Sequence, residues 1–221
     1  VKRYHRQDFK LPSYPHFVKL ISKHLPFLVI LLHSTFEKCD GTSFVDSTSI
    51  AVCKNYRIRS HKVLKRFAAR SKTTKGWFFG LKLHTIINFD GSIVKAFFTP
   101  GNTDDRTALK SMTKNVYGKI FGDRGYISKE LFKELFGGGI ELVTAVRRNM
   151  KNKLMDWQDK MMLKKRALIE TVFGKIKLLG KFEHSRHRSV TNAFSHMVAV
   201  LINYQLSSNK PSIRNPAVIT P

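Results

Sequence analysis

The stretch at 164–177, Lys-Lys-Arg-Ala-Leu-Ile-Glu-Thr-Val-Phe-Gly-Lys-Ile-Lys, constrains this chain more than any other. Apolar residues recur in and beside it at three- and four-residue intervals without an intervening proline, which predicts an amphipathic helix. This apolar set comprises Leu163, Ala167, Ile169, Val172, Phe173, Ile176 and Leu179. Arg166, Glu170 and Lys177 are spaced by four and seven residues. They are therefore expected on one stripe of the helix, with the carboxylate between two cations.

Two acidic residues elsewhere give this helix a functional meaning. Taken alone, an Arg and a Glu four residues apart would be an ordinary ion pair on a helix surface. However, Asp46 ends a short apolar run at 44–46, and Asp123 follows a second run at 119–122. Each is expected at the C-terminal end of a short strand. Together with Glu170 they make three acidic residues that a folded domain could gather.

The order and context of these acids resemble a known enzyme family. Two Asp followed by a Glu, in an Arg-x-x-x-Glu-x-x-x-x-x-x-Lys helix, is similar to the catalytic domain of the DDE transposases of bacterial insertion sequences. Three further segments also resemble sequences of this family: Pro-Gly-Asn-Thr-Asp-Asp-Arg at 100–106, Gly-Asp-Arg-Gly-Tyr at 122–126 and His-Ser-Arg-His-Arg-Ser at 184–189. The resemblance spans residues 41–205. Where the family usually has Tyr, three residues before the Arg, this chain has Leu163.

The resemblance implies a ribonuclease-H-like fold and a metal-dependent reaction. In-line displacement at phosphorus is served by two metal ions roughly 3.5–4 Å apart, and Mg²⁺ prefers oxygen ligands. Asp46, Asp123 and Glu170 are accordingly expected to be the catalytic residues and to hold two Mg²⁺ ions, with Mn²⁺ as a substitute. Asp46 would bridge both ions, Asp123 would bind one and Glu170 the other. By the same resemblance, Lys177 would touch the terminal bases of the element.

Periodicity along the rest of the chain predicts an α/β domain at 41–206. Strict alternation at 77–88, the turn signal Asp90-Gly91 and the apolar run at 93–99 predict a β-hairpin. The predicted order, β-β-β-α-β-α-β-α, matches the ribonuclease-H-like mixed sheet of the family. The expected strands are 42–46, 77–88, 93–99, 119–122 and 140–146. One helix is expected to begin near Asp104. The other expected helices cover 128–136, 164–177 and, at the end of the domain, 191–206.

The two ends of the chain are expected to lie outside this domain. Residues 1–40 contain two apolar pieces of helical periodicity and are predicted to be a short N-terminal helical remnant. Because the chain begins at Val1 without Met, we expect part of an N-terminal region to be lacking, and with it much of the sequence preference for the ends of an element. Residues 207–221 are polar and contain proline, and a disordered tail is expected.

The charge of the chain predicts a polyanionic partner. Forty Lys and Arg against 15 Asp and Glu give a formal net charge of +25, spread over the whole chain, which favours double-stranded DNA. The stretch at 53–76 is strongly basic and interleaved with aromatic residues, as expected for an insertion that follows phosphates. The residues predicted to bind DNA are Arg166, Lys177, Lys62, Lys65, Arg66, Arg147, Arg148, Arg186 and Arg188.

Other polar residues are interpreted as structural. His84 lies within a predicted strand and is expected to be a buried, hydrogen-bonded histidine, and Asp104 and Asp105 are expected to cap a helix. His184 and His187 lack further zinc ligands at suitable spacing. Cys39 and Cys53, the only cysteines, fit no metal motif and indicate a reducing compartment.

Location and assembly follow from these features. The longest apolar run, at 25–32, contains a proline and is too short to span a bilayer. With no signal-peptide pattern, the protein is expected in the bacterial cytoplasm, associated with the nucleoid and with no membrane. A homo-oligomer in the DNA complex is possible.

Two alternatives to an active transposase remain open at this point. A decayed or domesticated transposase would keep the charge and bind DNA without chemistry, although the presence of all three acids argues against it. A ribonuclease-H-type or Holliday-junction nuclease would share the fold and the metals. Strand transfer, as opposed to simple cleavage, separates a transposase from such a nuclease.

Overall fold

The computed structural model describes residues 12–74, 76–145, 155–183 and 186–213. A six-stranded mixed sheet forms its centre, with the strand order β2-β3-β1-β5-β6. β4 lies beside β2 on the same edge of β3, because β2 pairs with the first half of β3 and β4 with the second half. The strands are β1 (Thr42–Cys53), β2 (Ala69–Thr73), β3 (Gly76–Ile87), β4 (Ile93–Pro100), β5 (Gly118–Gly122) and β6 (Ile140–Thr144).

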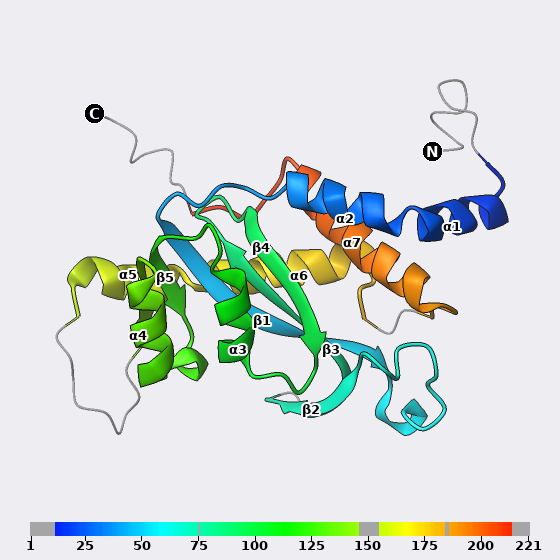
Figure 1. Ribbon diagram of the computed structural model, residues 1–221, viewed down its shortest axis with the longest axis horizontal. Helices are drawn as coiled ribbons and strands as arrows, with labels where there is room; N and C mark the ends of the chain where they lie inside the picture. The colour runs from blue at the N-terminus through cyan, green and yellow to red at the C-terminus, as the bar shows by residue number, and fades with distance from the viewer. Residues whose placement is uncertain (1–11, 75, 146–154, 184–185, 214–221) are drawn as a thin grey trace.

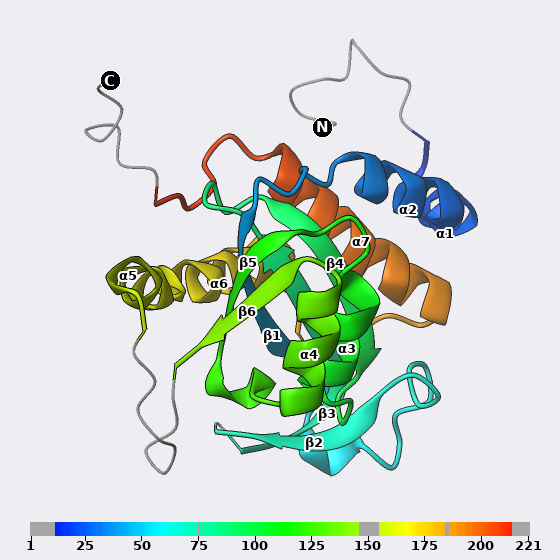
Figure 2. The same ribbon diagram turned by 60° about the vertical axis from the view of Figure 1, so that its left-hand side comes forward.

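Helices cover both faces of the sheet and extend beyond one of its ends (Figure 1). α1 and α2 pack along α7, whereas α3 and α4 lie together on one face of the sheet, as Figure 2 shows from the side. The helices are α1 (Tyr14–Lys23), α2 (Leu25–Ser34), α3 (Asp105–Met112), α4 (Lys129–Gly137), α5 (Trp157–Lys165), α6 (Ala167–Gly180) and α7 (Val190–Leu206). Two 3₁₀ turns, η1 (Asn55–Arg57) and η2 (Arg124–Tyr126), follow β1 and β5.

The core has two parts, one on each face of the sheet. Consecutive strand residues point to opposite faces, so Phe44 joins the apolar cluster under α6 and α7 while Val45 joins the cluster under α3 and α4. β3 is buried on both faces through most of its length. Such two-sided coverage explains why β3 is apolar over most of its length.

The ribonuclease-H-like α/β fold class predicted from the sequence is confirmed. Three antiparallel strands, β1, β3 and β4, lead into β5 and β6, which run parallel to β1. The predicted hairpin at 77–99 is present, with Gly91 at φ +65° in its turn. α3 begins at its Asp104 cap, whose side chain accepts from the Arg106 N–H.

Five details of the prediction were wrong. The first strand does not end at Asp46 but continues to Cys53, because its polar middle pairs with β3 over the whole length. The basic stretch at 53–76 contains an extra strand, β2, which pairs with the start of β3. An additional helix, α5, follows β6, and the predicted helix at 164–177 is interrupted at Arg166, where α5 ends and α6 begins. Ala167 and Leu179, assigned to its apolar stripe, are exposed.

The described part of the C-terminal segment packs on the domain. The Ile213 N–H donates to the Phe89 carbonyl (3.1 Å). The carbonyl oxygen of Pro211 lies only 2.1 Å from the position that a Cβ atom on Gly91 would occupy, so no side chain fits there. Residues 207–213 therefore contact the β3–β4 turn, and the remainder of the predicted tail lies outside the described residues.

No single helix in the described ranges is long and apolar enough to cross a bilayer. The pair α1 and α2, bent by 65° relative to each other, meets the criterion jointly, by length and composition alone.

Candidate active site

Strand register places Asp46 and Asp123 at equivalent positions on neighbouring strands. β1 and β5 run parallel, and Phe44 pairs with Phe121. The two Asp residues each lie two positions further along, so the same register aligns them, although Asp46 is in the middle of β1 and Asp123 just follows β5. Neighbouring strands are about 4.8 Å apart. The ladder thus brings two carboxylates together that are 77 residues apart in sequence.

Arg166 connects the third acid to this pair. Its Nη1 donates to Oδ2 of Asp46 at 2.7 Å, and its Nη2 donates to Oε1 of Glu170 at 3.2 Å. The break between α5 and α6 occurs at this residue, which carries its guanidinium toward β1. The predicted Arg166–Glu170 pair is therefore present and is part of a bridge to Asp46.

Asp46 occupies an environment that disfavours its charge. Burial raises the pKa of this carboxyl above its ordinary value, and the nearby Asp123 adds to that rise. The Ser47 N–H, which donates to Oδ1 at 2.8 Å, and the Arg166 guanidinium act in the opposite direction without cancelling the effect of burial. The site thus concentrates negative charge that a cation would relieve.

The acidic residues suit a divalent cation by their chemistry. Carboxylate oxygens are the donors that Mg²⁺ prefers, and Asp46 and Asp123 are close enough for their charges to interact. Within the described residues, however, no three His, Cys, Asp or Glu side chains stand together as a metal-binding group. Arg166 bonds Asp46 and Glu170 at once, so its guanidinium neutralises both carboxylates.

Lys177 forms its hydrogen bonds with β1 and with Glu183. Its Nζ donates to the Ser49 carbonyl (2.7 Å) and to Oε1 of Glu183 (2.6 Å). Lys177 and Arg166 thus both face β1, as their shared stripe predicted, but the carboxylate partner of Lys177 is Glu183. Any contact of Lys177 with DNA would have to compete with these two bonds.

A second polar cluster supports Asp46 from the opposite face of the sheet. Asp105 accepts from Ser47 Oγ and from Lys82 Nζ, both at 2.9 Å. Ser47 in turn donates its N–H to Asp46. From the sequence, Asp105 is expected only at the start of α3. The signal that could have indicated this contact is the polar run at 47–49. It lies in the middle of a strand that is covered on both faces, so its side chains need polar partners.

Buried polar groups continue this cluster. His84 is 1% exposed, its Nε2 lies 2.8 Å from Thr99 Oγ1, and its Nδ1 lies 3.7 Å from Oδ1 of Asp105 without a hydrogen-bond partner among the described residues. Burial lowers the pKa of His84 to about 4, so the ring is neutral at neutral pH. Burial raises the pKa of Tyr126 well above its usual value, and Asp105, Asp46 and Asp123 raise it further. These carboxylates therefore all lie near one buried hydroxyl.

The predicted DNA-binding residues fall into separate groups. Lys62, Lys65 and Arg66 are exposed in the segment between β1 and β2, and Arg186 and Arg188 are exposed just before α7. Arg147 and Arg148 lie outside the described residues. Arg166 and Lys177 are half-buried and bonded within the protein.

Comparison with known families decides the assignment. The family described as "Transposase DDE domain" matches residues 36–190, which include Asp46, Asp123 and Glu170 together with all six strands of the sheet. The chain belongs to this DDE transposase family. The resemblance to DDE transposases found in the sequence is thereby confirmed, and the chain is a transposase domain.

A solved structure supports the fold of this transposase domain. The chain is similar to the protein in a cryo-EM structure of the piggyBac transposase synaptic complex with hairpin DNA, with a TM-score of 0.54 and 9% sequence identity. The similarity covers 87% of this chain and 53% of the piggyBac chain, so the domain spans about half the length of that protein. No match was found among individually curated proteins.

Proposed function

We propose that this chain is the catalytic part of a transposase that cuts DNA and joins the freed strand to a new site, at the ends of a bacterial insertion sequence. The observation that carries the proposal is the alignment of Asp46 with Asp123, with Glu170 tied to Asp46 through Arg166. Membership of the DDE family supports the same reaction. A DNA substrate would place the protein in the cytoplasm, at the bacterial nucleoid.

Divalent ions, Mg²⁺ with Mn²⁺ as substitute, fit the donors and would activate the attacking oxygen and stabilise the leaving oxygen of an in-line displacement. Asp46, Asp123 and Glu170 would hold these ions. Arg166 would keep Asp46 and Glu170 neutralised until DNA and metal arrive. Its planar fork then suits a phosphate oxygen of the substrate, because guanidinium binds phosphate as well as carboxylate.

The test is cleavage and strand transfer by variants that remove one carboxylate at a time. Asp46→Asn, Asp123→Asn and Glu170→Gln should each abolish cleavage with Mg²⁺ while duplex binding persists. Asp104→Asn is the matched control, because Asn caps a helix about as well as Asp and Asp104 pairs only with exposed Arg106. An Asp46→Asn protein that still nicks DNA would refute the assignment.

Strand transfer distinguishes the remaining possibilities. A labelled duplex with a free 3′-OH should become joined to a target plasmid. Cleavage without joining would indicate a nuclease of the same fold, and duplex binding without either reaction would indicate a DNA-binding protein that has lost its chemistry. Homo-oligomerisation in the DNA complex is part of the proposal and would be measured on the same complexes by mass photometry.

A further inference from the structure

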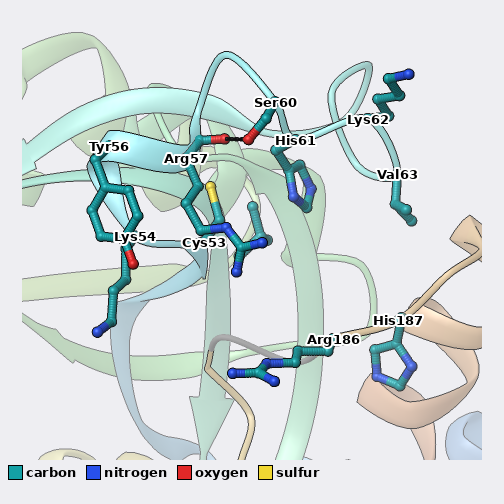
Figure 3. Close-up of a pocket in the computed structure, with 11 residues that line it drawn as sticks. Cys53, Lys54, Tyr56, Arg57, Ser60, His61, Lys62, Val63, Arg186 and His187 are labelled. Carbon is teal, nitrogen blue, oxygen red and sulfur yellow. Dashed lines mark hydrogen bonds between the residues drawn. The ribbon is translucent and has the colours of Figure 1, made fainter.

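A second site lies beyond the C-terminal end of β1. A pocket of about 520 Å³ opens between the segment that follows β1 and the segment that precedes α7, with Cys53, Arg57, His61 and Arg186 among its lining residues. Figure 3 shows Arg57 and Arg186 extending into it from opposite walls. None of these residues belongs to the acidic cluster around Asp46.

The wall of this pocket between β1 and β2 is held in place by packing. Leu64 is 3% exposed and inserts into the main core. The ring of His61 packs edge-on against Phe79, and its Nε2 accepts from the Leu64 N–H at 3.2 Å. Asn55 Nδ2 donates to the Trp77 carbonyl at 2.8 Å. The segment between β1 and β2, which carries Arg57 and His61, is therefore anchored to β3.

The pocket is positively charged without internal compensation. Lys54, Arg57, Lys62 and Arg186 line it, and none of its described lining residues is acidic. In the described ranges, none of these four cations lies within ion-pair distance of a carboxylate, unlike Arg166 or Lys177. Burial and the neighbouring Arg57 lower the pKa of His61, which adds a neutral N–H donor. Uncompensated guanidinium groups that converge in this way suit a phosphate oxygen.

The position of the pocket relative to Asp46 specifies which phosphate could reach it. Seven residues of β1 separate Asp46 from Cys53, a distance of about 23 Å at roughly 3.3 Å per residue. Duplex DNA rises about 3.4 Å per base pair. A duplex that follows β1 from the active site would therefore pass the pocket about seven base pairs away.

We propose that this pocket binds one backbone phosphate of the DNA substrate, about seven nucleotides from the phosphate that is cut. Arg57 and Arg186 hold the phosphate from opposite sides, and His61 contributes a neutral donor. This inference rests on the proposed function, since it takes the substrate to be DNA. It adds a defined contact that would fix the duplex along β1.

Cys53 provides a readout that does not depend on catalysis. Its thiol lines the pocket, whereas Cys39, the only other cysteine, is buried and serves as an internal reference. The rate of N-ethylmaleimide labelling would be followed by mass spectrometry on the Asp46→Asn protein in EDTA, with a 30-base-pair duplex. With duplex at ten times its Kd, labelling of Cys53 should slow by about tenfold, because only free protein reacts.

Matched variants separate the pocket from general charge. Arg57→Gln and Arg186→Gln should each weaken duplex binding and restore labelling of Cys53 in the remaining complex. Arg59→Gln removes the same charge two residues from Arg57, but Arg59 does not line the pocket, and protection should remain. Equal effects of Arg57→Gln and Arg59→Gln would overturn the proposal.

Single methylphosphonates along each strand locate the contact. A neutral linkage about six to eight nucleotides from the cut should weaken binding of the wild type and should have no further effect on Arg57→Gln. Protection of Cys53 by inorganic phosphate but not by duplex would identify a free-anion site and would refute a DNA contact.

The outcomes also distinguish this proposal from the function on which it rests. If duplex protects Cys53 but the wild type never cuts DNA, the proposed reaction is wrong and the pocket assignment stands. If cleavage depends on Asp46 but bound duplex leaves Cys53 fully reactive, the reaction stands and the pocket assignment is wrong.

Discussion

Arg166 donates from Nη1 to Oδ2 of Asp46 across 2.7 Å, although 120 residues separate them in sequence. Both side chains are about one-fifth exposed. The bond joins the start of α6 to the middle of β1 and at the same time neutralises the acid that is expected to hold metal. The same contact is therefore expected to affect both the stability of the fold and the binding of metal.

The first prediction concerns this contact. Arg166→Gln should reduce the free energy of unfolding by about 1–3 kcal/mol in EDTA, the range for a hydrogen bond to a charged group that is partly exposed. Mg²⁺ should restore part of the loss, because it neutralises the same carboxylates. Urea unfolding with and without Mg²⁺ measures both effects. Arg106→Gln, which breaks only the exposed pair with Asp104, should change stability little and independently of Mg²⁺.

Asp105 is expected to position Asp46 through Ser47. Asp105→Asn weakens the acceptor that Ser47 Oγ and Lys82 share, so cleavage should fall by about 10–100-fold, as for partners of metal ligands. The Mg²⁺ concentration that gives half-maximal cleavage should rise as well, a shift that a purely structural role would not produce. Asp104→Asn, one residue away on the same helix, is the control. An unchanged Mg²⁺ requirement in Asp105→Asn would contradict this role.

His84 should make the protein sensitive to mild acid. Its pKa is about 4 in the folded state and about 6.5 in an unfolded chain. Because the unfolded chain takes up the proton first, stability is retained above pH ~6.5 and lost as the pH falls toward 4, by an amount on the order of 3 kcal/mol. Thermal unfolding of wild type and His84→Gln across this range measures the difference. A constant difference between the two proteins would show that His84 does not titrate as expected.

Binding to DNA should depend steeply on salt. If about 6–10 phosphates are neutralised, affinity should fall by about 10³–10⁵ between 50 and 200 mM salt. Fluorescence anisotropy with an unrelated duplex measures the slope, and the element's own ends provide the comparison. Binding that is insensitive to salt would indicate a partner other than nucleic acid.

Local sequence determined several elements of this protein by itself. The alternating sequence pattern at 77–88 predicted β3, since a side-chain period of two is that of a strand. Asp104 specified the start of α3, because its side chain caps the free N–H groups wherever the helix packs. The identity of the acidic residues and of the basic segments also depended on sequence alone, and it was enough to assign the family.

Long-range pairing decided the rest. β1 continues through the polar residues 47–49 because β3 supplies its hydrogen bonds and Asp105 supplies a partner for Ser47. The helix at 164–177 breaks at Arg166, whose side chain bonds Asp46 on β1. Such contacts depend on residues brought together from distant parts of the chain, so no local periodicity could have predicted them. The basic stretch at 53–76 could be recognised from the sequence because it is local. The pocket that it forms with Arg186 could not, because Arg186 is more than 100 residues away along the chain and only the fold brings the two together.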